Sequence, residues 1–202
     1  MTPAPLQDAP ANPRRRPARE ALLAAASRRF YADGLAGTGI DSITAEAGVA
    51  KKSLYNNFAS KSDLVTAYLH ARHEEWLGLY RAREAGAATA ADRVLAVFDA
   101  YADHAGFAYE RGFRGCGLLN AAAELPAGDP GRAVVRRHKE EVEALLAGHV
   151  AELVPESPDR AASLARHLAF LLEGSMARAG LEGDDGCLRE ARGIASGLIG
   201  GL

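Results

Sequence analysis

Apolar residues recur at helical spacing along most of the chain. Between residues 19 and 33 they fall on one helical face, and Gly34 ends the pattern. Comparable stripes predict further helices over about residues 61–84, 92–109, 132–153, 159–179 and 184–198. No clear run alternates in the way that a strand requires. We therefore expect an all-α protein of about nine helices, including short ones that the stripes do not resolve.

The stretch from Thr38 to Lys61 holds two short helical patterns joined by a tight turn. Thr38 and Asp41 are spaced as a capping box at the start of the first helix. Gly48 can take the left-handed conformation that ends that helix. Such a pair is typical of a helix-turn-helix, whose second helix enters the major groove of DNA.

The second helix of this pair has two different faces. Leu54 and Phe58 would bury one of them, whereas the other carries ammonium, hydroxyl, phenol and amide groups and no carboxylate. A solvated helix face normally mixes charge signs, so this bias suits contact with phosphates and bases. We expect phosphate contacts from Thr38, Tyr55 and Lys61, and base or phosphate contacts from Lys51, Lys52, Ser53, Asn56 and Asn57.

The residues GLAGTGIDSITAEAGVAKKSLYNNFASKSDLV resemble the DNA-binding region of the tetracycline-repressor (TetR) family of bacterial transcription regulators. The resemblance extends over about residues 19–68, with the AGV, LYNNF and SK elements in register. Two positions depart from the family pattern. Ala50 stands where Ser or Thr often caps the second helix, a change that costs about 1 kcal/mol. Lys52 stands where a small residue is usual, so the operator preference cannot be inherited from relatives.

The resemblance implies an N-terminal three-helix DNA-binding domain followed by a helical ligand-binding and dimerisation domain. We assign residues 19–65 to the first and residues 66–202 to the second. Residues 1–18 are rich in Pro and Ala and contain Arg14, Arg15 and Arg16. They are expected to form a disordered basic arm that reaches DNA, or only a solubilising tail.

Charge is divided unevenly along the 202 residues. The first 62 contain nine Lys and Arg against five Asp and Glu, whereas the remainder contains 15 against 21. The formal charge of −2 therefore conceals a basic N-terminal third on an acidic remainder. A DNA-binding head on an acidic body fits this division. An architectural protein that binds DNA without sequence preference would ordinarily be basic throughout, but this alternative stays open.

The segment FRGCGLLNAAAEL (residues 113–125) is similar to a motif of one branch of the family, where it forms a helix lining the regulatory cavity. From the residues alone, Cys116, Asn120 and Glu124 can share one inward face. A buried amide and carboxylate need partners, which a small-molecule effector, neighbouring helices or Arg114 could supply. The candidate ligand-binding residues are Trp76, Phe98, Tyr101, Phe113, Cys116, Asn120, Glu124 and Phe170.

The last two helical patterns offer more apolar surface than a lone helix pair could cover. Folding both against their own chain is one interpretation, and the family resemblance implies the other, a four-helix bundle formed by two copies. A homodimer is favoured because two half-sites of a palindromic operator supply the specificity that one short helix lacks. The candidate interface residues are Leu164, Leu168, Leu171, Leu172, Met176, Ala191, Ile194, Ala195 and Leu198.

Neither a metal site nor a cofactor site is indicated. His70 and His73 could share a helix face, but no third ligand is nearby, so surface histidines are the better interpretation. Cys116 and Cys187 lie far apart and form no CxxC pair, which argues against a disulfide scaffold or zinc. Sensing of an oxidant or electrophile by the Cys116 thiol stays open as an alternative function.

Catalysis is not expected. His104, Glu124 and His138 could act as acid and base, yet no nucleophile motif or phosphate loop accompanies them. No run approaches the length of a membrane span, and the N-terminus lacks the apolar core of a signal peptide, so a cytoplasmic location is expected. The sequence thus predicts a homodimeric transcription regulator that binds double-stranded DNA, most simply a repressor released from its operator by a small-molecule effector.

Overall fold

The computed structural model describes residues 17–107 and 109–202. This part of the chain contains nine α-helices and no strand, which confirms the all-α prediction. The expected basic arm falls outside the described residues except for residues 17 and 18, which begin the first helix.

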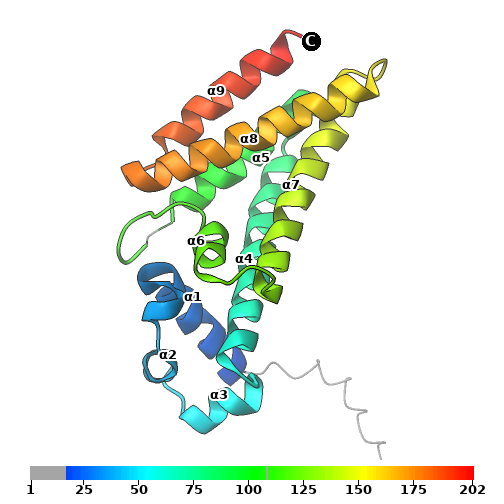
Figure 1. Ribbon diagram of the computed structural model, residues 1–202. Helices are drawn as coiled ribbons and strands as arrows, with labels where there is room; N and C mark the ends of the chain where they lie inside the picture. The colour runs from blue at the N-terminus through cyan, green and yellow to red at the C-terminus, as the bar shows by residue number, and fades with distance from the viewer. Residues whose placement is uncertain (1–16, 108) are drawn as a thin grey trace, which may run out of the picture.

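The helices divide the molecule into two ends, with one long helix between them. They are α1 (Pro17–Gly37), α2 (Ile40–Ala47), α3 (Lys51–Asn57), α4 (Lys61–Glu84), α5 (Ala90–Ala105), α6 (Gly117–Glu124), α7 (Pro130–Leu153), α8 (Pro158–Glu182) and α9 (Gly186–Gly200). We call α1–α3 the head and α5–α9 the body. Figure 1 shows an elongated molecule in which α4 leads from the head into the body, and α8 and α9 lie at the end farthest from α3.

Local sequence sets several helix ends. The Ser60 hydroxyl accepts a hydrogen bond from the backbone N–H of Asp63 at 3.0 Å, and α4 has the bounds that the sequence predicts. Gly48 adopts the expected left-handed conformation, with φ of 67°. The predicted capping box at Thr38 is wrong, because α2 begins after Gly39 and the Thr38 hydroxyl donates elsewhere.

A continuous apolar core runs from the head into the body. Leu22, Ile43 and Leu54 are fully buried in the head. Farther along the core, the large buried side chains Trp76 of α4 and Tyr101 of α5 lie with ring centroids 5.3 Å apart. Among the described residues, no helix combines the length and the apolar character that crossing a bilayer requires.

Candidate nucleic-acid interface

Helix α3 is anchored by few side chains and turns most of its polar groups outward. Leu54 is fully buried and Phe58, just beyond the helix, is 4% exposed, so these two hold α3 against the head. Tyr55 is 50% exposed although its ring is large. The other side chains of the helix that lie on the surface are Lys51, Lys52 and Asn56, and Ser53 is partly exposed.

The start of α3 has no side-chain cap. Ala50 is the N-cap, as expected, and no side chain caps the helix there. The N–H of Ser53 donates to the Ala50 carbonyl oxygen at 2.8 Å. Backbone N–H groups at an uncapped helix start favour contact with negative charge, such as a DNA phosphate.

Three of the candidate DNA contacts donate hydrogen bonds to backbone carbonyl groups of the head. Thr38 is 1% exposed, and its hydroxyl donates to the carbonyl oxygen of Gly34 at 2.7 Å. The Lys61 ammonium donates to the Leu35 carbonyl oxygen at 2.6 Å. The Asn57 amide nitrogen donates to the Ser53 carbonyl oxygen at 2.8 Å, one turn back in α3. The outward groups are therefore fewer than the sequence suggested, and Thr38 lies in a supporting position.

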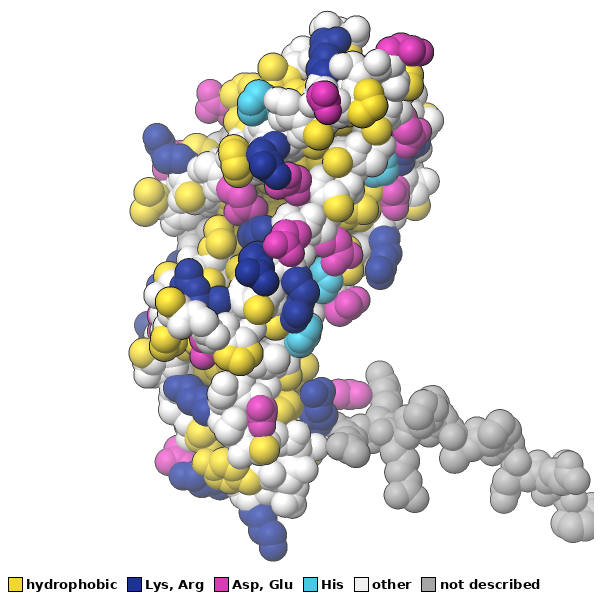
Figure 2. Space-filling model, turned by 45° about the vertical axis from the view of Figure 1, so that its right-hand side comes forward, with side chains coloured by type: hydrophobic (Ala, Val, Ile, Leu, Met, Phe, Trp, Pro, Cys, Tyr) yellow, Lys and Arg dark blue, Asp and Glu magenta, His cyan; other side chains and the backbone are white. Residues whose placement is uncertain are grey.

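Charge at the tip of the head is mixed. Figure 2 shows Lys and Arg side chains at that end of the molecule, with acidic side chains among them. The Lys51 ammonium lies 2.8 Å from the Asp41 carboxylate of α2, and both side chains are exposed. The hydrogen bond to Asp41 raises the pKa of Lys51, so this lysine remains charged at neutral pH.

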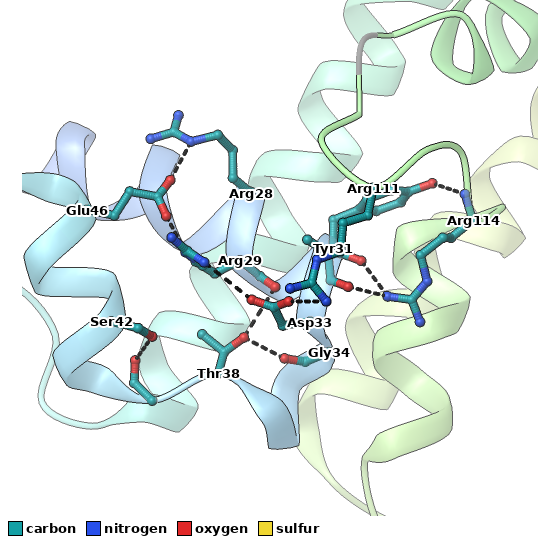
Figure 3. A network of polar contacts seen from close by, with 12 residues as sticks. Arg28, Arg29, Tyr31, Asp33, Gly34, Thr38, Ser42, Glu46, Arg111 and Arg114 are labelled. Atoms are coloured by element: carbon teal, nitrogen blue, oxygen red, sulfur yellow. Dashed lines mark hydrogen bonds and ion pairs between the residues drawn. The ribbon is translucent and has the colours of Figure 1, made fainter.

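A second ion cluster fixes α2 against α1. Glu46 of α2 lies between Arg28 and Arg29 of α1, with its Oε1 2.5 Å from the Arg28 Nε (Figure 3). Partial burial raises the pKa of Glu46, but the bonds to the two arginines outweigh burial and lower it overall. The first helix of the helix-turn-helix is thereby held to the supporting helix, which fixes where α3 points.

Comparison with known proteins agrees with this geometry. The family model for bacterial regulatory proteins of the tetR family matches residues 22–68, which contain α2, the turn and α3. The solved structure of SCO4454, a TetR-family transcriptional regulator from Streptomyces coelicolor, is 32% identical, with a TM-score of 0.76 over 92% of this chain and 93% of that chain. This chain belongs to the TetR family.

Other solved TetR regulators agree over similar lengths. One from Chloroflexus aurantiacus is 27% identical, with a TM-score of 0.77 over 90% of this chain and 93% of its own. A putative one from Streptomyces avermitilis is 30% identical, with a TM-score of 0.69 over 88% and 97%. No curated protein matches the chain. The matched family model describes bacterial regulatory proteins, and the solved relatives are described as transcriptional regulators.

The candidate ligand residues of this TetR-family chain are spread over several environments. Trp76 of α4 is packed in the core together with Phe98 and Tyr101 of α5. Phe113 and Cys116 are also buried, whereas Phe170 is 66% exposed on α8, away from the others. The structure therefore does not gather the eight residues around one cavity.

Asn120 and Glu124 have protein partners, the alternative that the sequence left open. The Asn120 amide donates to the Arg114 carbonyl oxygen at 2.9 Å. The Glu124 carboxylate accepts hydrogen bonds from the backbone of the head. A hollow of about 430 Å³ lies between α6 and α8, and Arg114, Cys116 and Asn120 are among its lining residues.

The candidate dimer residues of this TetR-family chain divide between core and surface. Those buried in their own chain are Leu168, Leu172, Met176, Ala191 and Ala195, with Leu164 and Leu171 partly buried. Ile194 and Leu198 are 48% and 45% exposed. One face of α8 and α9 packs onto α7 and α5, so the buried residues of this list belong to the core of their own chain.

The histidines of α4 differ from the sequence interpretation. His70 is exposed, but the His73 side chain is 16% exposed, with its Nδ1 3.0 Å from the Nδ1 of His138 on α7. Burial lowers the pKa of His138 to about 2, so this imidazole is neutral at physiological pH. His73 is thus a packing residue between α4 and α7, and not a surface histidine.

Proposed function

We propose that the protein is a dimeric regulator that recognises a palindromic operator by placing one α3 in each of two successive major grooves. The outward face of α3 carries this proposal, since the helix presents cationic, phenolic and amide groups there and contains no carboxylate of its own. The family membership supports it, because the matched region contains the whole helix-turn-helix. A DNA target would place the protein in the cytoplasm.

The apolar surface of α8 and α9 supports the dimer. Phe170, Ile194 and Leu198 are large apolar side chains left exposed on these two helices. Phe170 and Ile194 border a shared groove of about 440 Å³. A second copy related by two-fold symmetry would cover this surface and form a four-helix bundle. The two heads would then face the same side of a DNA duplex.

We further propose repression relieved by a small molecule that binds the body. The hollow between α6 and α8 offers an amide and a guanidinium beside apolar residues, a composition suited to an apolar molecule with one polar group. A second possible binding region lies among the buried aromatic side chains Trp76, Phe98 and Tyr101, which a ligand could contact only if the helices around them separate. An effector that binds more tightly to the conformation with displaced heads would lower DNA affinity. The size of this loss is limited by the difference between the effector's affinities for the two conformations.

Selection of bound duplexes from a random DNA pool, at physiological salt, tests the proposed recognition. A palindromic consensus with half-sites about one helical turn apart is the expected result. Recovery of no consensus, together with binding that disappears as salt increases, would instead support an architectural DNA-binding protein and refute this proposal.

Two substitutions in α3 should act differently on the selected sites. Asn56→Ala removes an exposed amide and should change the preference among operator variants, with a loss of about 1–3 kcal/mol confined to the bases that it reads. Tyr55→Phe removes a hydroxyl expected at a phosphate and should weaken binding to all variants to a similar extent. Titration of each variant against a panel of single-base operator changes measures both. Equal losses across the panel for Asn56→Ala would contradict its role in reading bases.

A thiol-based response through Cys116 is a second candidate function. The Lys139 ammonium donates to the Cys116 Sγ at 3.7 Å, so the thiol lies beside a cation. Burial lowers the pKa of Lys139, but Cys116, Tyr101 and Glu173 raise it more strongly, so the charge is retained. Cys116 also borders the hollow between α6 and α8, through which a small electrophile could approach.

Treatment with N-ethylmaleimide distinguishes this candidate from a purely reversible effector. Alkylation is expected to lower operator affinity in the wild-type protein and in Cys187→Ser, and to leave Cys116→Ser unaffected. Cys187 is the matched control because it lies on α9 and its thiol donates to the Glu182 carboxylate, whereas the Cys116 sulfur accepts from the Lys139 ammonium. Mass spectrometry should locate the adduct, and unchanged operator binding by protein alkylated at Cys116 would eliminate the thiol function.

A further inference from the structure

Helix α1 is broken just before the helix-turn-helix. Gly34 has φ of 81° and ψ of 168°, values outside the helical range, after which one more turn leads to Gly37. Such a break leaves carbonyl groups before it and N–H groups after it without their usual partners in the helix. Two residues of the body supply the missing partners.

The carboxylate of Glu124 meets the N–H groups after the break. Glu124 ends α6, and its two oxygens accept from the backbone of Leu35 at 2.9 Å and of Ala36 at 2.7 Å. The approach is close, since a Cβ on Gly34 would lie 2.7 Å from the Glu124 Oε1. An anion at the start of a helical turn is the favourable arrangement, because the free N–H groups there carry partial positive charge.

The guanidinium of Arg114 meets the carbonyl groups before the break. Arg114 lies in the loop that precedes α6, and its Nη1 donates to the carbonyl oxygens of Tyr31 at 2.9 Å and Ala32 at 2.7 Å (Figure 3). The backbone N–H of Arg114 also donates to the Tyr31 hydroxyl at 2.7 Å. Asn120 holds the loop to α6 through its bond to the Arg114 carbonyl oxygen. One short segment of the body thus presents a cation and an anion in the order that the break in α1 requires.

We propose that Arg114 and Glu124 are positioning residues for DNA binding, which fix the angle between the helix-turn-helix and the body. This inference rests on the proposed function, since the angle matters only when two heads read one operator. The bonded turn leads directly through Gly39 into α2, and the Lys61 ammonium of α4 holds the same turn at Leu35. Movement of α6 would therefore be carried to α2 and α3.

The preference for half-site spacing tests the inference better than affinity alone. Two heads held at a fixed separation act as one ligand with a high effective concentration at the second half-site, whereas loosely held heads tolerate other separations. Glu124→Gln keeps the side-chain size but places an NH₂ group against a backbone N–H. We expect operator affinity about tenfold lower, with a reduced difference between the selected spacing and spacings longer or shorter by one base pair.

The experiment uses the full chain and duplexes derived from the wild-type selection. Glu140→Gln is the matched control, because Glu140 is an exposed carboxylate on α7 that pairs with Arg136 of the same helix. Arg114→Ala provides a second variant, and circular dichroism establishes that each variant is folded. The inference is supported if either folded variant, Arg114→Ala or Glu124→Gln, shows a smaller difference in affinity between the selected half-site spacing and the altered spacings. Binding of that variant to a single half-site should be unchanged.

Other outcomes overturn it in distinguishable ways. Unchanged spacing preference in both variants would refute the positioning role while leaving the regulator proposal intact. Equal losses on every spacing and on a single half-site would assign these residues to the folding of the head instead. If unfolding prevents measurement on both, hydrogen exchange at the Leu35 and Ala36 amides of the wild-type protein decides, since free exchange contradicts the bonding. A wild-type selection without half-sites would remove both proposals.

Discussion

Ile194→Asp is expected to convert the dimer into folded monomers and to reduce operator affinity by about 100-fold or more. Ile194 is already 48% exposed in the single chain, so a carboxylate there meets water in the monomer. In a bundle of α8 and α9 from two copies, the same carboxylate and its symmetry mate would be buried in an apolar interface, which is strongly unfavourable. Loss of the dimer removes the linkage between the two heads.

Sedimentation equilibrium at micromolar concentration and titration of the selected operator measure the two effects. Phe107→Asp serves as control, because Phe107 is a large apolar residue of 37% exposure that lies between α5 and α6, outside the α8 and α9 surface. It should leave the oligomeric state unchanged. A dimeric Ile194→Asp protein with full operator affinity would place the interface on a different surface.

Gly180→Ala is expected to cost about 1–3 kcal/mol in the free energy of unfolding, as overpacking of a dense contact does. The Cβ would lie 2.6 Å from the Gly115 nitrogen and 2.8 Å from the Arg114 carbonyl carbon. Both atoms belong to the backbone, so no side chain can rotate away from the new methyl group. Either α8 or the loop that carries Arg114 must move.

Urea denaturation of Gly180→Ala beside Gly148→Ala separates this close approach from helix propensity. Gly148 lies within α7, and a Cβ there would meet nothing within 4 Å. This control should gain up to about 1 kcal/mol, because alanine favours a helix over glycine. Wild-type stability in Gly180→Ala would mean that the contact between α8 and the loop is looser than its geometry indicates.

Local signals were sufficient for much of the fold. The apolar stripe and the Ser60 cap gave both ends of α4, and Gly48 marked the end of α2. The capping box predicted at Thr38 is wrong because the Thr38 hydroxyl bonds to the Gly34 carbonyl oxygen and not to the start of α2. The break at Gly34 leaves a carbonyl oxygen 2.7 Å away, and that tertiary arrangement prevails over the capping box.

The candidate sites were less accessible to sequence reasoning. The exposed groups of α3 were found because their residue types are unusual for a solvated helix. The bonds from Glu124 to Leu35 and Ala36 join positions 89 and 88 residues apart, and no local pattern indicates such a pairing. The available signals were a glycine followed by one helical turn at residues 34–37 and the carboxylate that ends α6. They indicate a contact only when the positions of α1 and α6 relative to each other are known.

In the free protein, the Lys51 ammonium is already paired with the Asp41 carboxylate. A backbone phosphate competes with Asp41, whose carboxylate lies 2.8 Å from the ammonium, as well as with counterions from solution. Displacement of Asp41 releases fewer ions, so Lys51 adds little to the attraction that all sequences share. A head would then dissociate faster from DNA of unrelated sequence than it would with an unpaired Lys51. In the proposed complex, Asp41 would therefore increase the contrast between the operator and other DNA without reading a base itself.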